Sequence, residues 1–163
     1  MFRKALPYFT NDVALLYYNA FIKSRFSYCL MFWIHNTRAG RYKLLDKIDS
    51  VILTLARRCG MNVNDYVNMT GICDVLKCSK LQCMSFMHSV MHKSIHVPYL
   101  QVTLNNMIHE HNTRQSADIH VGEQCSLDQR NFPYQCLLLW NECPLTVRLM
   151  HKSAFVRNCK LLL

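Results

Sequence analysis

The sequence lacks any long apolar run. A membrane-spanning helix needs roughly 18 to 20 consecutive apolar residues, and the longest run here covers only 28–34, Tyr-Cys-Leu-Met-Phe-Trp-Ile. Near the N-terminus, Asn11 and Asp12 interrupt the apolar region that a signal peptide would need. We therefore expect a protein that spans no membrane and works inside the cell, in the nucleus or the cytoplasm.

Acidic residues are scarce as well. The 163 residues include 10 Asp and Glu against 19 Lys and Arg, which gives a formal net charge of +9. An excess of this kind bears on partners rather than on fold, and it favours nucleic acid, an anionic membrane surface or an acidic protein. The hydrophobic fraction of 51% is ordinary for a globular protein and excludes disorder along the whole chain.

Two common metal-binding patterns are also missing. The sequence contains no Cys-x2-Cys pair and no His-Glu-x-x-His motif, which are typical of structural and catalytic zinc sites. Its nine cysteines are odd in number and show no small-domain spacing. We therefore expect reduced thiols rather than a disulfide framework, and no cofactor.

Helical periodicity is what the sequence does contain, most clearly over 41–58. Apolar residues recur there on one stripe, whereas basic residues lie mostly off it, and Gly60 supplies a stop. The stripe consists of Leu44, Leu45, Ile48, Val51, Ile52 and Leu55, and the basic residues are Arg41, Lys43, Lys47, Arg57 and Arg58. Such a helix packs one face on a core and offers the other face to an anionic partner.

The remaining patterns predict a mostly α fold. We expect helices over about 12–24, 70–77 and 80–95, the last one capped by Ser79, and a C-terminal helix capped by Ser153. Residues 36–40 and 61–70 are polar and predict connections, and 101–130 lose their periodicity. The predicted organisation is a small helical bundle over 1–60, a helical linker over 61–100 and an irregular segment with C-terminal helices over 101–163.

Several short elements follow one another in a particular order. An aromatic helix over 17–22 precedes Phe26-Ser27-Tyr28-Cys29, Phe32-Trp33 and the basic helix that ends in Ala56-Arg57-Arg58. Further on come His111-Asn112-Thr113-Arg114, Leu139-Trp140-Asn141 with Pro144-Leu145, and Lys160-Leu161-Leu162. This order resembles the thumb and the region after it in the reverse transcriptases of non-LTR (LINE-type) retrotransposons.

The resemblance implies a thumb that holds a template–primer duplex by its backbone. It would place Lys43, Lys47, Arg57 and Arg58 near phosphates, with Arg38 and Arg114 as further candidates. Phosphate contacts of this kind hold and orient a duplex without reading its sequence. The implied partner is an RNA–DNA hybrid or RNA, recognised by its shape and backbone.

The catalytic carboxylates of that family are missing. Reverse transcription needs paired carboxylates that hold two Mg²⁺ ions, and the family supplies them in an aromatic-x-Asp-Asp motif of its palm. This sequence has no adjacent Asp pair, and Asp46 and Asp49 lie among the basic residues of the predicted helix. Cys143 also stands where the family has Leu. We therefore expect a non-catalytic part of such a polymerase that lacks the palm, and not an enzyme.

Histidines and cysteines raise a separate question of metal binding. His88, His92 and His96 recur every four residues and would share one helix face, downstream of Cys73, Cys78 and Cys83. The cysteines recur every five residues, which turns successive thiols away from each other around a helix. We therefore favour a polar helix face with buried thiols over a zinc site. His109 and His111 flank Glu110, but no nucleophile lies near them in the sequence.

The aromatic residues of 28–34 also allow two interpretations. Tyr28, Phe32 and Trp33 are residue types that stack on bases. A run of seven apolar residues is more typical of a core, and we expect these aromatic side chains to be buried.

Two other functions remain open at this point. The first alternative is a helical interaction module whose basic face binds an acidic protein. Alternatively, it is a decayed fragment without a function, which exposes the apolar surface that a palm once covered.

Overall fold

The computed structural model describes residues 2–28, 30–36, 38–72, 74–98, 100, 102–108, 116–121 and 132–163. Helices account for most of these residues, so the fold is mostly α, as predicted. The helices are α1 (Phe2–Ala5), α2 (Asn11–Tyr17), α3 (Ser24–Ser27), α4 (Leu30–Asn36), α5 (Arg38–Arg58), α6 (Val63–Thr70), α7 (Val75–Met91), α8 (Asn105–Ile108), α9 (Phe132–Glu142), α10 (Leu145–Arg148) and α11 (Lys152–Leu162), with a 3-10 turn η1 (Leu6–Tyr8) and a π-helical segment η2 (Tyr18–Lys23). Within these ranges no helix is both long enough and apolar enough to cross a lipid bilayer.

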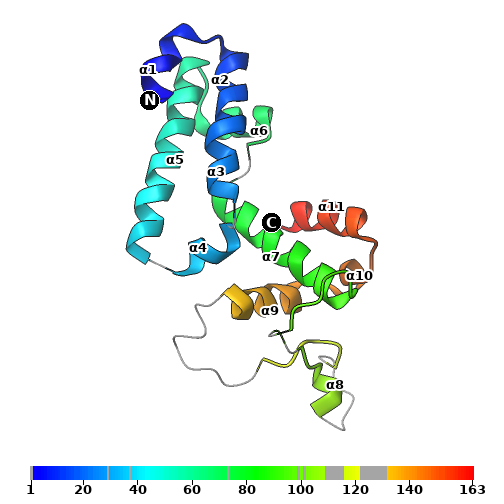
Figure 1. Ribbon diagram of the computed structural model, residues 1–163. Helices are drawn as coiled ribbons and strands as arrows, with labels where there is room; N and C mark the ends of the chain where they lie inside the picture. Colours follow the sequence, from blue (N-terminus) through cyan, green and yellow to red (C-terminus); the bar gives the residue numbers. More distant parts are fainter. Residues whose placement is uncertain are drawn as a thin grey trace.

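Two antiparallel rods form an upright arm (Figure 1). The first rod is continuous through α2, η2 and α3, and the second is α5. The first rod begins at Asn11, within one residue of the predicted start, and the hydroxyl of Thr10 caps it by accepting a hydrogen bond from the backbone N–H of Val13 at 3.4 Å. The segments α1, η1 and α6 pack around the upper part of the two rods and complete the arm.

The arm has its own hydrophobic core. Ile48, Ile52 and Leu55 of α5 are buried, and Leu45 and Val51 pack against them, which confirms most of the predicted stripe. The other buried members of this core are Leu6, Ala14, Tyr18, Phe26, Leu30, Ile34, Ala56, Tyr66, Ile72 and Val75.

The helices α7 to α11 form a second unit, the body, below the arm in Figure 1. Helix α7 enters it from the base of the arm and contacts α9 and α11. The core of the body includes Cys83, Met84 and Met87 of α7. Its other buried members are Ile119, Phe132, Cys136, Leu137, Trp140, Cys143, Val147, Phe155 and Cys159. The segment 61–100, which we predicted to be a linker, thus contributes to both cores.

Two polar side chains attach residues 116–121 to the body. The amide of Asn141 accepts a hydrogen bond from the backbone N–H of Ile119 at 2.9 Å and donates one to its carbonyl at 2.8 Å. The buried guanidinium of Arg148 forms an ion pair with Asp118 at 2.8 Å. It also donates hydrogen bonds to the carbonyls of Cys143 at 2.6 Å and Asn141 at 2.8 Å. The segment also pairs with 103–106 through the bridge between Leu104 and Ile119 and through backbone hydrogen bonds such as that from His120 N–H to the Thr103 carbonyl at 2.7 Å.

The predicted break between helices at 77–80 is wrong. Helix α7 is continuous from Val75, and Ser79 lies inside it with a side chain that is 2% exposed. The N-cap is Asp74, whose carboxylate accepts a hydrogen bond from the backbone N–H of Leu76 at 2.9 Å. Gly71, with φ of 64°, ends α6 rather than opening a helix. Serine is a residue type that often caps helices, but Ser79 is buried in the interior of helix α7 and therefore adopts a helical conformation.

The predicted loop at 36–40 is also wrong, because α5 already begins at Arg38. Gly40 favours a loop on sequence grounds, yet glycine costs only about 1 kcal/mol in a helix. The packing of the long helix outweighs that cost. The C-terminal helix begins at Lys152 with His151 as its N-cap, two residues before the position that a Ser153 cap predicts.

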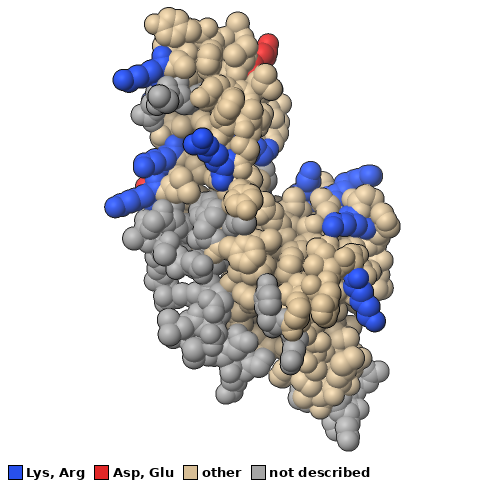
Figure 2. Space-filling model, viewed as in Figure 1, with Lys and Arg blue, Asp and Glu red and all other residues tan. Residues whose placement is uncertain are grey.

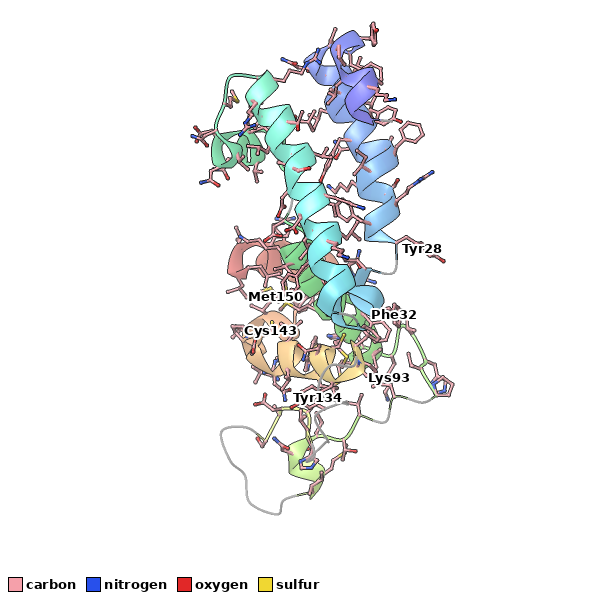
Figure 3. All side chains as sticks on the ribbon, turned by 90° about the vertical axis from the view of Figure 1, so that its left-hand side faces the viewer. Tyr28, Phe32, Lys93, Tyr134, Cys143 and Met150 are labelled. Carbon is pink, nitrogen blue, oxygen red and sulfur yellow. The ribbon has the colours of Figure 1, made fainter. Side chains whose placement is uncertain are left out.

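The apolar run at 28–34 is only half buried, which corrects our expectation of a buried aromatic cluster. Leu30 and Ile34, one helical turn apart in α4, are 0% and 1% exposed. Tyr28 precedes α4, is 79% exposed and projects away from the helices in Figure 3. Phe32 is 40% exposed and stacks on Phe132, with 4.3 Å between the ring centroids. The side chain of Trp33 lies outside the described part. A short helix buries one face, so a run of apolar residues cannot all enter the core.

This division can be tested with two substitutions. Leu30→Ala should lower the free energy of unfolding by about 2–5 kcal/mol, because it leaves a cavity in the arm core. Tyr28→Ala should change it by less than about 0.5 kcal/mol, because that side chain contacts mainly solvent. Urea denaturation of both variants measures the difference. An equal loss of unfolding free energy in the two variants would show that Tyr28 belongs to a core.

Candidate nucleic-acid interface

Helix α5 presents its sides to different surroundings. Its residues Ile48, Ile52, Leu55 and Ala56 face the arm core. At about 100° per residue, Lys43, Lys47 and Arg57 lie within an arc of about 80° on the opposite side. All three are exposed. The apolar period of the sequence therefore fixes which side of α5 faces solvent.

We refer to Lys43, Lys47 and Arg57 as the α5 basic face. With a rise of about 1.5 Å per residue, its two ends are about 21 Å apart along the helix. Thr54 lies between them, and its hydroxyl bonds back to the carbonyl of Ser50 at 2.7 Å. Among the described residues, none forms an ion pair with a member of this face. Figure 2 shows Lys and Arg side chains over the arm and over the body, with little Asp or Glu on the same side.

The acidic residues of α5 lie on its other flank. Asp46 and Asp49 line a pocket of about 530 Å³ between α5, α6 and the start of α7, together with Asp74. Partial burial raises the pKa of Asp49, and the charges of Asp74 and Asp46 raise it further. Asp49 lies about 120° around the helix from Lys43, whereas Asp46 lies about 60° from it and borders the α5 basic face.

Arg58 has a different role from the one that the sequence suggests. Its guanidinium donates hydrogen bonds to the carbonyls of Leu6 and Phe9 and, at 3.0 Å, to the amide oxygen of Asn11. These groups belong to the segment that leads into the first rod. Arg58 therefore fastens the N-terminal segment to the end of α5, and each of its three guanidinium nitrogens donates to the chain itself.

The side chains of the other two predicted binding residues, Arg38 and Arg114, are not described by the structure. Arg38 is the first residue of α5, but its side chain lies outside the described part of the structure. Arg114 lies outside the described residues altogether, as do His109, Glu110 and His111.

Further basic residues escaped the sequence analysis. Arg25 is exposed on the first rod and lines a pocket that faces α5. Lys23, Lys77 and Lys160, from η2, α7 and α11, line one pocket of about 550 Å³ between the arm and the body. The latter three are far apart in the sequence, so no local signal could have grouped them.

The histidines do not form the common face that their spacing suggests. Helix α7 ends at Met91, so His96 lies beyond it and is exposed. His88 is 3% exposed, and its Nε2 lies 2.9 Å from the carbonyl of Met150. His92 Nε2 lies 3.0 Å from the carbonyl of Arg148, and the two imidazoles stack at 4.1 Å. Each ring nitrogen facing a carbonyl must carry a hydrogen, so these histidines join α7 to the turn before α11.

The thiols in the described part are free and mostly buried. The six described cysteines form no disulfide. A hydrogen bond with Cys83 and burial raise the pKa of Cys136, and burial raises the pKa of Cys159 to about 12. Such thiols stay protonated and unreactive. Cys73 lies outside the described residues, and the residues described include no group of His, Cys, Asp and Glu able to hold a metal ion.

Comparison with protein-family models, with curated proteins and with solved structures found no match to this chain.

The different roles of two adjacent arginines can be tested by substitution. Arg58→Ala should lower the free energy of unfolding by about 1–2 kcal/mol, because carbonyls of the N-terminal segment lose a charged donor. Arg57→Ala is the matched control and should change it by less than about 0.5 kcal/mol. Denaturation of both variants in urea gives the comparison. Equal stability of the two would contradict the anchoring role of Arg58.

The buried His88 should make the stability depend on pH. Burial lowers its pKa in the folded state, and the nearby His92, Lys152 and His151 lower it further. The unfolded chain takes up a proton near pH 6.5 whereas the folded chain does not. The free energy of unfolding should therefore fall below about pH 6.5, by up to about 1.4 kcal/mol per pH unit from this residue.

The variant His88→Gln isolates that contribution. Glutamine keeps an N–H that reaches toward the carbonyl of Met150 but does not titrate. Urea denaturation between pH 7.5 and 5 should show a weaker pH dependence in the variant than in the natural chain. An identical pH dependence would mean that His88 takes up its proton equally in both states.

Proposed function

We propose that the chain binds the sugar–phosphate backbone of nucleic acid through the α5 basic face, as a non-catalytic thumb-like module of the non-LTR reverse transcriptase type. The observation that carries the proposal is the set of exposed basic side chains on the solvent side of α5, opposite the side that packs on the arm core. Lys43, Lys47 and Arg57 are exposed there, and the carboxylates of Asp46 and Asp49 line a pocket on the adjoining flank.

The length of the face suits a nucleic-acid strand. One strand of a duplex advances about 3.4 Å per nucleotide, so about 21 Å between Lys43 and Arg57 corresponds to about six nucleotides. Lysine and arginine reach phosphates from a helix surface without inserting into a groove, which holds a duplex of any sequence. An RNA–DNA hybrid or an RNA duplex is the preferred partner in this proposal, as the family resemblance implies.

A salt series tests this proposal. Binding of the full chain to an RNA–DNA hybrid should weaken with salt, because each phosphate contact releases condensed counterions. The variant Lys43→Ala/Lys47→Ala/Arg57→Ala should bind more weakly, and its log–log salt slope should be shallower by about 2 to 3 units. Fluorescence anisotropy of a labelled hybrid measures both quantities.

A charge-matched control separates the basic face from net charge. The variant Lys80→Ala/Arg157→Ala/Lys160→Ala removes three exposed charges from α7 and α11 and should keep most of the original slope. If both variants lose the same affinity and the same salt slope, binding depends on total charge only. If the folded natural chain binds no nucleic acid at low salt, the basic face is a solvated surface, and an acidic protein becomes the better partner.

A further inference from the structure

A pocket lies between the two rods of the arm, and we call it the arm pocket. Its volume is about 390 Å³, within the range of small-molecule sites. It is lined by Tyr17, Phe21, Ile22, Arg25, Phe26, Leu44 and Ile48. Phe21 is 56% exposed, so one wall of the pocket is an aromatic ring open to solvent.

The aromatic wall is held in position by its neighbours. The ring of Phe21 packs on that of Tyr17 with 4.6 Å between centroids, and Tyr17 packs on Phe9 at 5.5 Å. Phe9 in turn packs against the arm core. A ring that is already fixed loses less side-chain entropy when a ligand stacks on it. Phe21 also lies in the π-helical segment η2, a type of irregularity that is frequent at functional sites.

The charge around the arm pocket is positive. Arg25 is exposed and lines it, and no carboxylate does. On α5, Lys47 is about 60° around the helix from Leu44, which lines the pocket. The arm pocket therefore adjoins the α5 basic face. The pocket on the opposite flank of α5 is lined by Asp46, Asp49 and Asp74, so only the first of the two suits an anionic polymer.

We propose that the arm pocket takes one unpaired nucleobase, stacked on Phe21, from a strand whose phosphates contact Arg25 and the α5 basic face. This inference rests on the proposed function and adds the class of ligand to it. A base within a duplex is covered on both faces by its neighbours and cannot enter. The site therefore favours a single-stranded segment next to a duplex. An apolar protein segment would fill the same space, but it would leave the surrounding positive charge without a counterpart.

The test uses the full chain and a duplex with a short single-stranded overhang. In one version of the oligonucleotide all overhang bases are present, and in the other they are replaced by abasic sites that keep the phosphates. The natural chain should bind the version with bases roughly 5- to 100-fold more tightly, as expected for one stacked base. In Phe21→Leu this ratio should fall close to one, while the salt slope remains. Leucine keeps an apolar side chain against Tyr17.

Tyr8→Leu is the matched control, because Tyr8 is an arm aromatic that is 88% exposed and does not line the pocket. This variant should keep the preference for bases. Equal affinity of the natural chain for the two oligonucleotides would overturn the arm pocket as a base site, whereas a steep salt slope would still support the proposed function. If Phe21→Leu still prefers the overhang with bases, the arm pocket is likewise overturned as the base site. If folded natural chain binds neither oligonucleotide, both proposals fail.

Discussion

The structure depends on helix α7, because its first turn is buried in the core of the arm and its later turns are buried in the core of the body. Val75 belongs to the core of the arm, and Cys83, Met84 and Met87 belong to the core of the body. Helix α4 has a similar double role, because Leu30 is buried in the arm core and Met31 packs against the body core. Protein interiors are close-packed, so two helices fixed in this way set the position of the arm relative to the body.

Hydrogen bonds and an ion pair attach the irregular segment 116–121 to the helices of the body. The side chain of Asn141 pairs with both backbone groups of Ile119, as a neighbouring strand would. Arg148 joins the same segment through Asp118 and also binds carbonyls at the end of α9. Buried polar groups stabilise a fold when every one of them has a partner. These side chains, together with backbone hydrogen bonds to 103–106, hold 116–121 against the body.

In the arm, one helix carries both a core-packing side and a positively charged surface. One side of α5 packs on the arm core, the adjoining side lines an aromatic pocket, and the solvent side carries Lys43, Lys47 and Arg57. Arg58, next in sequence to that face, instead fastens the N-terminal segment. Neighbouring positions on a helix differ by about 100°, which is why adjacent residues of one charge come to have unrelated roles.

The sequence by itself determined the helical class, the approximate start of the first rod and most of the buried stripe of α5, because these follow from local capping and a period of 3.6 residues. It did not reveal that Ser79 is buried or that Tyr28 is exposed, since the core that covers one and not the other is built from distant segments. The arm pocket and the bonds of Arg58 to Leu6 and Phe9 were decided by tertiary structure alone. Which atoms a side chain meets across the fold depends on the packing of whole helices, and no local pattern encodes it.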